Sequence, residues 1–234
     1  MDVKYGKTGE FVFNDAADFL SSKEAVPKEV YDTLEKEAKD RAFTVSHYTQ
    51  ADILNQFLME LVNAVEDGTT FDTFYENMTT FLERNGYAAL NPWHADVIFQ
   101  TNVQTAFNAG HYKNMQAAKK FRPYWQYKTA GDGNVRETHA AMQDKVYAAD
   151  DPIWNVWYPP NGYQCRCTVV SLTKEQVERR GLQISTKPPT SLTEFGNVLV
   201  FPDKGFSNNP ATTKWKPDIS NFDEALKSIV REKK

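Results

Sequence analysis

YWQYKTAGDGNVRETHAAMQDKVYAADDPIWNVWYPPNGYQCRCTVVSL, residues 124–172, is the stretch of the chain that decides its fold. It opens with alternating aromatic and polar residues, Tyr124–Lys128, a pattern typical of a half-buried strand. It closes on Cys165–Val170, which is rich in β-prone residues and predicts a second strand after the turn Pro159–Gly162. Because every other residue of a strand lies on the same side, the two cysteines of this segment are expected to project together.

Between these strands the sequence predicts a turn and a short helix. Gly131–Asn134 has the composition of a turn, and its acid and amide side chains suit the start of a helix. The helix is predicted over Val135–Gln143, where Arg136 and His139 lie three residues apart and therefore on one face. We expect the histidine and the two cysteines to meet. Asp132 and Arg136, four residues apart, are expected to form an ion pair at the helix start.

A metal centre is the sharpest chemical hypothesis for this region, because zinc is commonly bound by thiolate and imidazole. His139, Cys165 and Cys167 would supply three ligands. Any of four residues could supply the fourth ligand: Asp132, Asp150, Asp151 or His111. The interpretation we favour needs no cofactor: Asp132 or a backbone carbonyl orients the histidine, the cysteines lie on a buried strand face, and the three side chains hold the turn shut.

The enzyme classes that combine histidine with cysteine do not fit these residues. A zinc deaminase needs His-x-Glu and Cys-x-x-Cys, whereas both residues after His139 are alanine and the two cysteines are one residue apart. A cysteine nucleophile paired with His139 would have no recognisable oxyanion-hole sequence beside it. The chain also has no Gly-x-x-x-x-Gly-Lys loop for phosphate. We therefore favour an interpretation without enzymatic activity, and an enzyme stays the alternative.

Helical periodicity dominates the chain before this stretch, with apolar residues at three-and-four spacing in Thr49–Val65 and in Phe71–Leu82. The predicted fold class is α+β, with an acidic helical N-terminal part followed by a small mixed α/β subdomain built around the Pro-Pro-Asn-Gly turn and the Cys-Arg-Cys strand. The predicted domains are an N-terminal arm with one charged helix (Pro27–Arg41) at 1–42, a helical domain at 43–118, the mixed subdomain at 119–186, and a loop-rich tail with a terminal helix at 187–234.

A third helix is predicted from Trp93 to about Ala118, N-capped by Asn91 and bent or closely approached at Gly110. Its middle is rich in amides and hydroxyls. These residues are Thr101, Asn102, Gln104, Thr105 and Asn108. Since buried amides need partners, we expect either a solvated face or a polar seam against the mixed subdomain.

Charge is distributed unevenly along the chain, although the net charge is only −4. Residues 1–100 contain 8 Lys/Arg and 18 Asp/Glu, a balance of −10, whereas residues 101–234 contain 19 and 13, a balance of +6. The acidic segment Phe43–Gln100 predicts docking to a protein with a basic face. The densest basic cluster, which is either a solvated face or a contact for nucleic acid, consists of Lys113, Lys119, Lys120, Arg122 and Lys128.

Composition is that of a folded chain made and kept in a cytosol. With 41% hydrophobic and 13% aromatic residues in a chain of 234, a substantial core can be buried. The absence of an apolar run of 18 residues and of an apolar N-terminal signal core predicts no membrane association. Two cysteines spaced Cys-x-Cys exclude a disulfide framework. The aromatic core is expected around the turn, from Trp125, Tyr127, Trp154, Trp157 and Tyr163.

The stretch also resembles the minor head (head morphogenesis) proteins of Mu-like phages and prophages. The residues that carry the resemblance are Trp125, Asp132, Arg136, His139, Pro160, Asn161, Cys165, Arg166 and Cys167, with Thr101 and Asn102 upstream. The resemblance covers the chain from about Phe43 to Gly181. This chain has Gln100 where the family usually has Arg, and Gln164 where it usually has Asn.

The resemblance implies a minor capsid protein that associates with the portal and procapsid during virion assembly. The implied partners are the portal protein, other capsid or scaffold proteins, and packaged DNA, with no membrane. The implied location is the host cytoplasm during assembly and then the virion head. A second interpretation stays open: phage head proteins of this type can carry or resemble effector modules, so His139, Cys165 and Cys167 would serve an enzyme or toxin-like domain, with or without zinc.

Overall fold

The computed structural model describes residues 14–193 and 196–212 of the chain. These residues fall into two units, one ending at Phe99 and the other comprising Gln100–Thr212. The dividing point lies inside helix α6 (Pro92–Ala118), whereas the sequence placed a boundary at the end of this helix. The terminal helix that the sequence predicts in the tail lies outside the described residues. Helices and strands occur together, so the predicted α+β class is confirmed.

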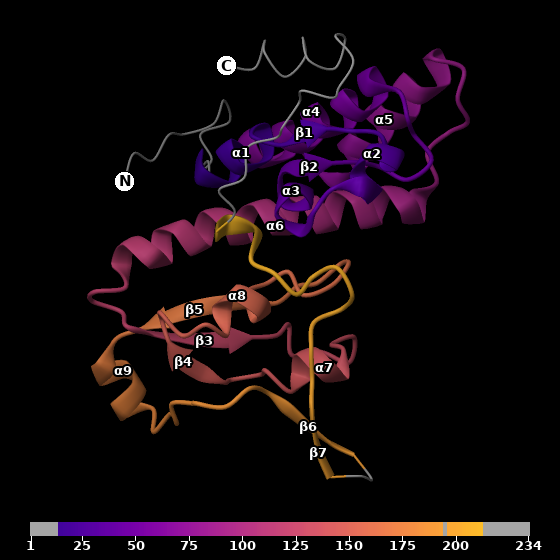
Figure 1. Cartoon of the computed structure of the whole chain (residues 1–234). Coiled ribbons are helices and arrows are strands. Elements are labelled where there is room, and N and C mark those ends of the chain that lie inside the picture. The colour runs from indigo at the N-terminus through magenta and orange to yellow at the C-terminus, as the bar shows by residue number, and fades with distance from the viewer. Residues whose placement is uncertain (1–13, 194–195, 213–234) are drawn as a thin grey trace. The chain divides into compact units, whose positions relative to one another are not determined.

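The first unit is mainly helical, as Figure 1 shows. Its elements are α1 (Asn14–Ser21), β1 (Glu24–Ala25), α2 (Lys28–Thr33), α3 (Lys36–Arg41), β2 (Ala42–Phe43), α4 (Ala51–Glu66) and α5 (Phe71–Arg84). The strands β1 and β2 pair in parallel. The sequence predicted one helix over Pro27–Arg41, but Leu34 is extended (φ −70°, ψ 146°) and divides this segment into α2 and α3. The predicted arm before residue 27 contains α1, which packs against α4.

Helices α4 and α5 confirm the periodic pattern of the sequence. The three-and-four stripe of α4 is buried against α1 and α5, and the Phe57 and Phe74 rings lie 6.4 Å apart. The Thr70 side chain caps α5 by accepting a hydrogen bond from the Thr73 amide. Gly86 follows the helix with φ +81°, a conformation in which a glycine ends a helix at low cost.

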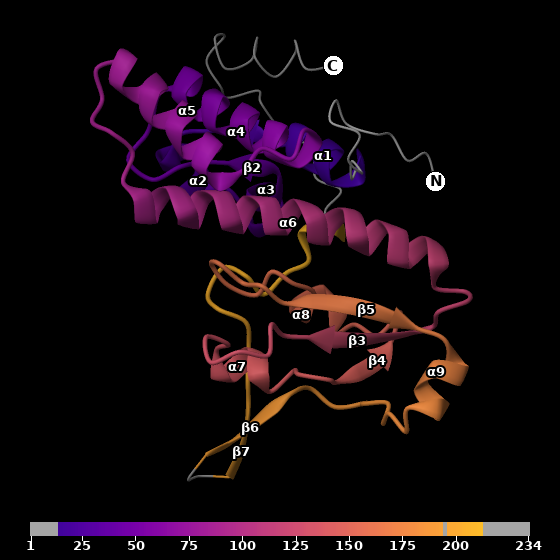
Figure 2. The same ribbon diagram turned by 180° about the vertical axis from the view of Figure 1, so that it is seen from behind.

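The second unit is built on a three-stranded antiparallel sheet in the order β4-β3-β5. The strands are β3 (Tyr124–Lys128), β4 (Val146–Ala148) and β5 (Thr168–Leu172). The remaining elements are α7 (Glu137–Ala140), α8 (Trp154–Trp157), α9 (Lys174–Arg179), the hairpin β6 (Thr190–Thr193) with β7 (Gly196–Leu199), and the 3-10 turn Pro210–Thr212. Figures 1 and 2 show β3 between its two partners and α9 directly after β5.

Two elements near the turn are shorter than the sequence predicts. Helix α7 covers four residues instead of Val135–Gln143, and β5 begins at Thr168 instead of at the first cysteine. Gln164, directly before the predicted strand, has φ +55°, and Cys165–Cys167 form no strand. The two cysteines therefore lie in irregular chain between the turn and the strand, where the alternation of a strand does not fix their direction.

The core of the second unit is aromatic, as predicted, with one exception. Trp125, Tyr127, Trp154 and Trp157 are buried and pack in one cluster with Tyr158, which the sequence did not single out. Tyr163 was predicted to join them, and this was wrong: it is 59% exposed and packs edge-on against Phe206.

Helix α6 runs without interruption through Gly110, so the predicted bend is not a break in the helix. Its start is capped as predicted, because Asn91 Oδ1 accepts a hydrogen bond from the His94 amide at 3.0 Å. Within the described residues, no helix combines the length and apolar character that a membrane span requires.

Candidate functional site

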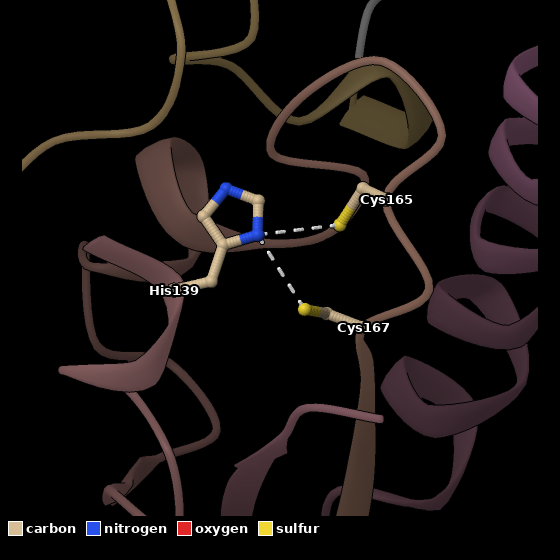
Figure 3. A group of neighbouring side chains, drawn as sticks. All are labelled: His139, Cys165 and Cys167. Carbon is tan, nitrogen blue, oxygen red and sulfur yellow. Dashed lines mark hydrogen bonds between the residues drawn. The ribbon is translucent and has the colours of Figure 1, made fainter. Parts of the chain in front are cut away.

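His139, Cys165 and Cys167 converge inside the second unit. His139 Nδ1 lies 3.8 Å from Cys165 Sγ and 3.6 Å from Cys167 Sγ, and the three atoms all lie within 4.8 Å of one another. Figure 3 shows the imidazole ring on α7 facing both sulfur atoms with one nitrogen. The three side chains are 2–3% exposed, and both cysteines are free thiols. The meeting that the sequence predicts is therefore confirmed.

A backbone carbonyl orients the imidazole ring. His139 Nε2 lies 3.1 Å from the Asn161 carbonyl oxygen, in the turn that follows the aromatic cluster. A ring nitrogen that faces a carbonyl oxygen donates its proton to it, so in the neutral ring the lone pair lies on Nδ1, which faces the sulfur atoms. Of the two predicted orienting groups, the carbonyl is the one that contacts the ring. Asp132 lies elsewhere, in an ion pair.

Asn161 connects several parts of the site and is completely buried. Its Oδ1 accepts a hydrogen bond from the Tyr127 hydroxyl of β3 at 2.7 Å. Its carbonyl accepts a second hydrogen bond, from the Asp203 amide, at 2.9 Å. Burial raises the pKa of Tyr127 well above its ordinary value, so this phenol remains a neutral donor. The turn, the sheet and the segment around residue 203 are thus joined through one side chain and its backbone.

The pKa values of the two thiols move in opposite directions. The pKa of Cys165 lies below its ordinary value, because Cys167 and then His139 hydrogen-bond to it, against the opposing effect of burial. The pKa of Cys167 lies above its ordinary value, because of the same hydrogen bond and of burial.

Polar side chains of α6 bind the backbone around the cysteines. Gln104 Nε2 and Asn108 Nδ2 lie 3.3 and 3.5 Å from the Cys167 carbonyl, and His111 Nε2 lies 2.8 Å from the Val169 carbonyl. The polar seam that the sequence offered as one alternative for this helix is therefore confirmed. His111 was a candidate fourth metal ligand, but it serves this seam instead.

The exposed edge of the site carries two ion pairs that differ from the predicted one. Asp132 binds Arg166 through both carboxylate oxygens, at 2.6 and 2.8 Å, and these bonds hold the pKa of Asp132 below its ordinary value. Arg136 binds Asp203 at 3.2 Å and donates to the Tyr163 carbonyl. The predicted pair of Asp132 with Arg136 was wrong, because each finds a partner from a distant segment.

Other residues of the family pattern support the site from outside. Trp125 is buried in the aromatic cluster, and Thr101 Oγ1 accepts a hydrogen bond from the Gln164 amide at 3.2 Å. Pro160 follows Pro159 through a cis peptide bond, directly before Asn161.

The side chains of the basic cluster differ in their contacts and in their exposure. Lys128 pairs with Asp144 at 2.5 Å, and Arg122 donates to Ser171 and Gln176. Lys113, Lys119 and Lys120 are exposed. Phe121, between Lys120 and Arg122, is 76% exposed, so an exposed aromatic side chain lies within this cluster.

Comparison with known proteins gives one family and two named relatives. The family described as "Phage Mu protein F like protein" matches residues 55–170. The "Putative capsid assembly protein F" of Escherichia phage Mu is 30% identical over 220 residues, covering 78% of this chain and 50% of that protein. The "Mu-like prophage FluMu F protein" of Haemophilus influenzae is 32% identical over 200 residues, covering 80% of this chain and 48% of that protein.

The chain spans about half the length of the curated relatives that it matches. No solved structure matches the chain significantly. The family match covers α5, α6, β3, β4 and the segment that carries His139, Cys165 and Cys167, so it includes the site described above. By this match and by both relatives, the chain belongs to the phage Mu protein F-like family.

Proposed function

We propose that this chain acts in phage head assembly as a minor capsid protein that docks on the portal region of the procapsid. The observation that carries the proposal is the match to the phage Mu F-like family, one of whose relatives is named as a capsid assembly protein. The burial of the His139 and cysteine side chains adds support, because side chains 2–3% exposed are poorly placed to meet a substrate. In this proposal the protein works in the host cytoplasm and then in the virion head.

The surface that favours a protein partner lies on the first unit. Helices α4 and α5 expose six acidic side chains: Asp52, Glu66, Asp67, Asp72, Glu76 and Glu83. Glu60 is instead buried and receives hydrogen bonds from Gln56 and Asn77, so it joins α4 to α5. An acidic surface on a rigid helix pair suits a partner with a basic face and disfavours contact with phosphate.

The docking proposal predicts that charge reversal on α5 weakens binding. Asp72→Lys with Glu76→Lys should lower the affinity for the purified portal protein of the same phage by about tenfold or more, since opposed charges at an interface become like charges. Biolayer interferometry at two salt concentrations would measure this. The matched control is Glu29→Lys with Asp150→Lys, two exposed acids outside α4 and α5. Absence of binding by the wild-type chain, or equal binding by both double variants, would contradict the proposal.

Contact with packaged DNA belongs to the same proposal and is assigned to the second unit. Lys119 and Lys120 are adjacent and exposed beside Phe121, at the end of α6. Lys119→Glu with Lys120→Glu should weaken DNA binding and reduce the slope of log K against log salt by about 2, because each lost phosphate contact removes about 0.9. Arg179→Glu with Arg180→Glu on α9 is the matched control. Fluorescence anisotropy with a DNA duplex measures the slope for each double variant. An unchanged slope in the lysine variant would show that Lys119 and Lys120 do not contact DNA.

A further inference from the structure

We infer that His139, Cys165 and Cys167 bind one zinc ion, through the imidazole Nδ1 and the two thiolate sulfur atoms. The first support is geometric. In a tetrahedral site with Zn–N of about 2.0–2.1 Å and Zn–S of about 2.3 Å, a ligating nitrogen and sulfur lie about 3.6 Å apart. The observed distances from Nδ1 to the sulfur atoms are 3.6 and 3.8 Å. The two nitrogen–sulfur distances therefore match a zinc site within a few tenths of an ångström. The two sulfur atoms, which lie up to 4.8 Å apart, would approach by about 1 Å, because sulfur ligands of a tetrahedral zinc ion lie about 3.8 Å apart.

The second support is the orientation of the ring. Histidines that ligate a metal usually donate their other N–H to a carboxylate or a backbone carbonyl, which fixes the tautomer and makes the ligating nitrogen more basic. His139 Nε2 faces the Asn161 carbonyl at 3.1 Å in this way. Asn161 is itself held by the Tyr127 hydroxyl, so the orienting group is rigid.

Hydrogen bonding alone accounts less well for the arrangement. A neutral imidazole with Nε2 protonated offers a single lone pair at Nδ1, which accepts one good hydrogen bond. Here two thiols approach that lone pair at similar distances, 3.6 and 3.8 Å. A metal ion uses the nitrogen lone pair and one lone pair of each sulfur, so it satisfies all three atoms together.

Charge supports the same conclusion. The charges of two thiolates and one divalent zinc ion sum to zero. Burying uncompensated charge is costly, so this balance suits a site whose side chains are only 2–3% exposed. Soft thiolate ligands also favour zinc over magnesium or calcium. Among residues 14–193 and 196–212, these three are the only cluster of histidine, cysteine and acidic side chains with this geometry, and they supply three of the four ligands that zinc usually takes.

Elemental analysis of the full chain tests the inference most simply. Untagged protein, expressed with zinc in the medium and purified without chelator, should contain about one zinc per chain. Titration with an organomercurial that caps thiols should release that zinc as the two cysteines react, followed with a colorimetric zinc indicator. This measurement uses only wild-type protein, so it does not depend on whether a variant folds.

Two further measurements separate binding at this site from binding elsewhere. Cobalt(II) added to apo-protein should give the intense visible bands of a tetrahedral site and a near-ultraviolet band from thiolate ligands. His47→Gln, which changes an exposed histidine of the first unit, should retain zinc, whereas Cys165→Ser and Cys167→Ser should lose it because hydroxyl is a poor zinc ligand. Protein that holds no zinc and shows no thiolate–cobalt band would overturn the inference, as would full zinc occupancy in folded serine variants.

Discussion

Trp157→Ala should destabilise the second unit by about 3–5 kcal/mol, the usual cost of truncating a large aromatic side chain in a packed core. Trp157 is 1% exposed, at the end of α8. Its ring packs edge-on against Tyr127 at 6.2 Å and against His139 at 6.3 Å. The substitution therefore opens a cavity beside both the sheet and the candidate metal ligands. Urea unfolding followed by circular dichroism and tryptophan fluorescence would measure the loss.

Phe121→Ala is the matched control for this substitution, because it removes an aromatic side chain of the same unit that is 76% exposed. A substitution on the surface away from special features usually changes the free energy of unfolding by less than about 0.5 kcal/mol. Equal unfolding midpoints for the two variants would mean that buried Trp157 contributes no more to stability than the exposed Phe121 does.

Asn161→Ala should destabilise the same unit by about 1–3 kcal/mol, because it leaves a buried donor without an acceptor. The donor is the Tyr127 hydroxyl, which lies 2.7 Å from Asn161 Oδ1. The backbone carbonyl that faces His139 remains in the variant but loses the side-chain bond that holds the turn to β3. Thermal and urea unfolding of the variant would give the change in free energy.

Tyr127→Phe supplies the control for this second prediction. Removing the hydroxyl as well as its acceptor leaves no orphaned donor, so the double variant should cost less than the sum of the two single variants. Strict additivity in this double-mutant cycle would show that the contact between Asn161 and Tyr127 contributes nothing to stability.

Local patterns in the sequence were sufficient for helices α4 and α5 of the first unit and for the position of the central strand of the second. The apolar stripes of α4 and α5 and the cap at Asn91 are set within a few turns of chain, where periodicity carries most of the information. The half-buried alternation predicted for β3 was wrong, because Gln126 is buried between Trp125 and Tyr127. The meeting of His139 with the two cysteines was also predictable, because a turn and two short elements bring them together.

The errors arose where a distant segment decides the outcome. Asp132 pairs with Arg166, 34 residues away, although Arg136 lies nearer in sequence. Tyr163 belongs to a short aromatic-rich stretch, yet Phe206 and solvent surround it. Leu34 interrupts a charged helix that propensity alone would continue. No local pattern singles out Asn161 as the residue that joins the turn to the sheet; its place in a Pro-Pro-Asn-Gly turn was the available signal.

We expect His139, Cys165 and Cys167 to maintain the fold of the second unit, and hydrogen–deuterium exchange tests this role most directly. Cys167 immediately precedes β5, whose Thr168 pairs with Lys128 of β3. In Cys167→Ser the amides of β3 and β5 should exchange about tenfold faster or more, because local opening becomes easier there. The amides of α4, in the other unit, should keep their rates. Unchanged protection of β3 and β5 in the variant would contradict the claim.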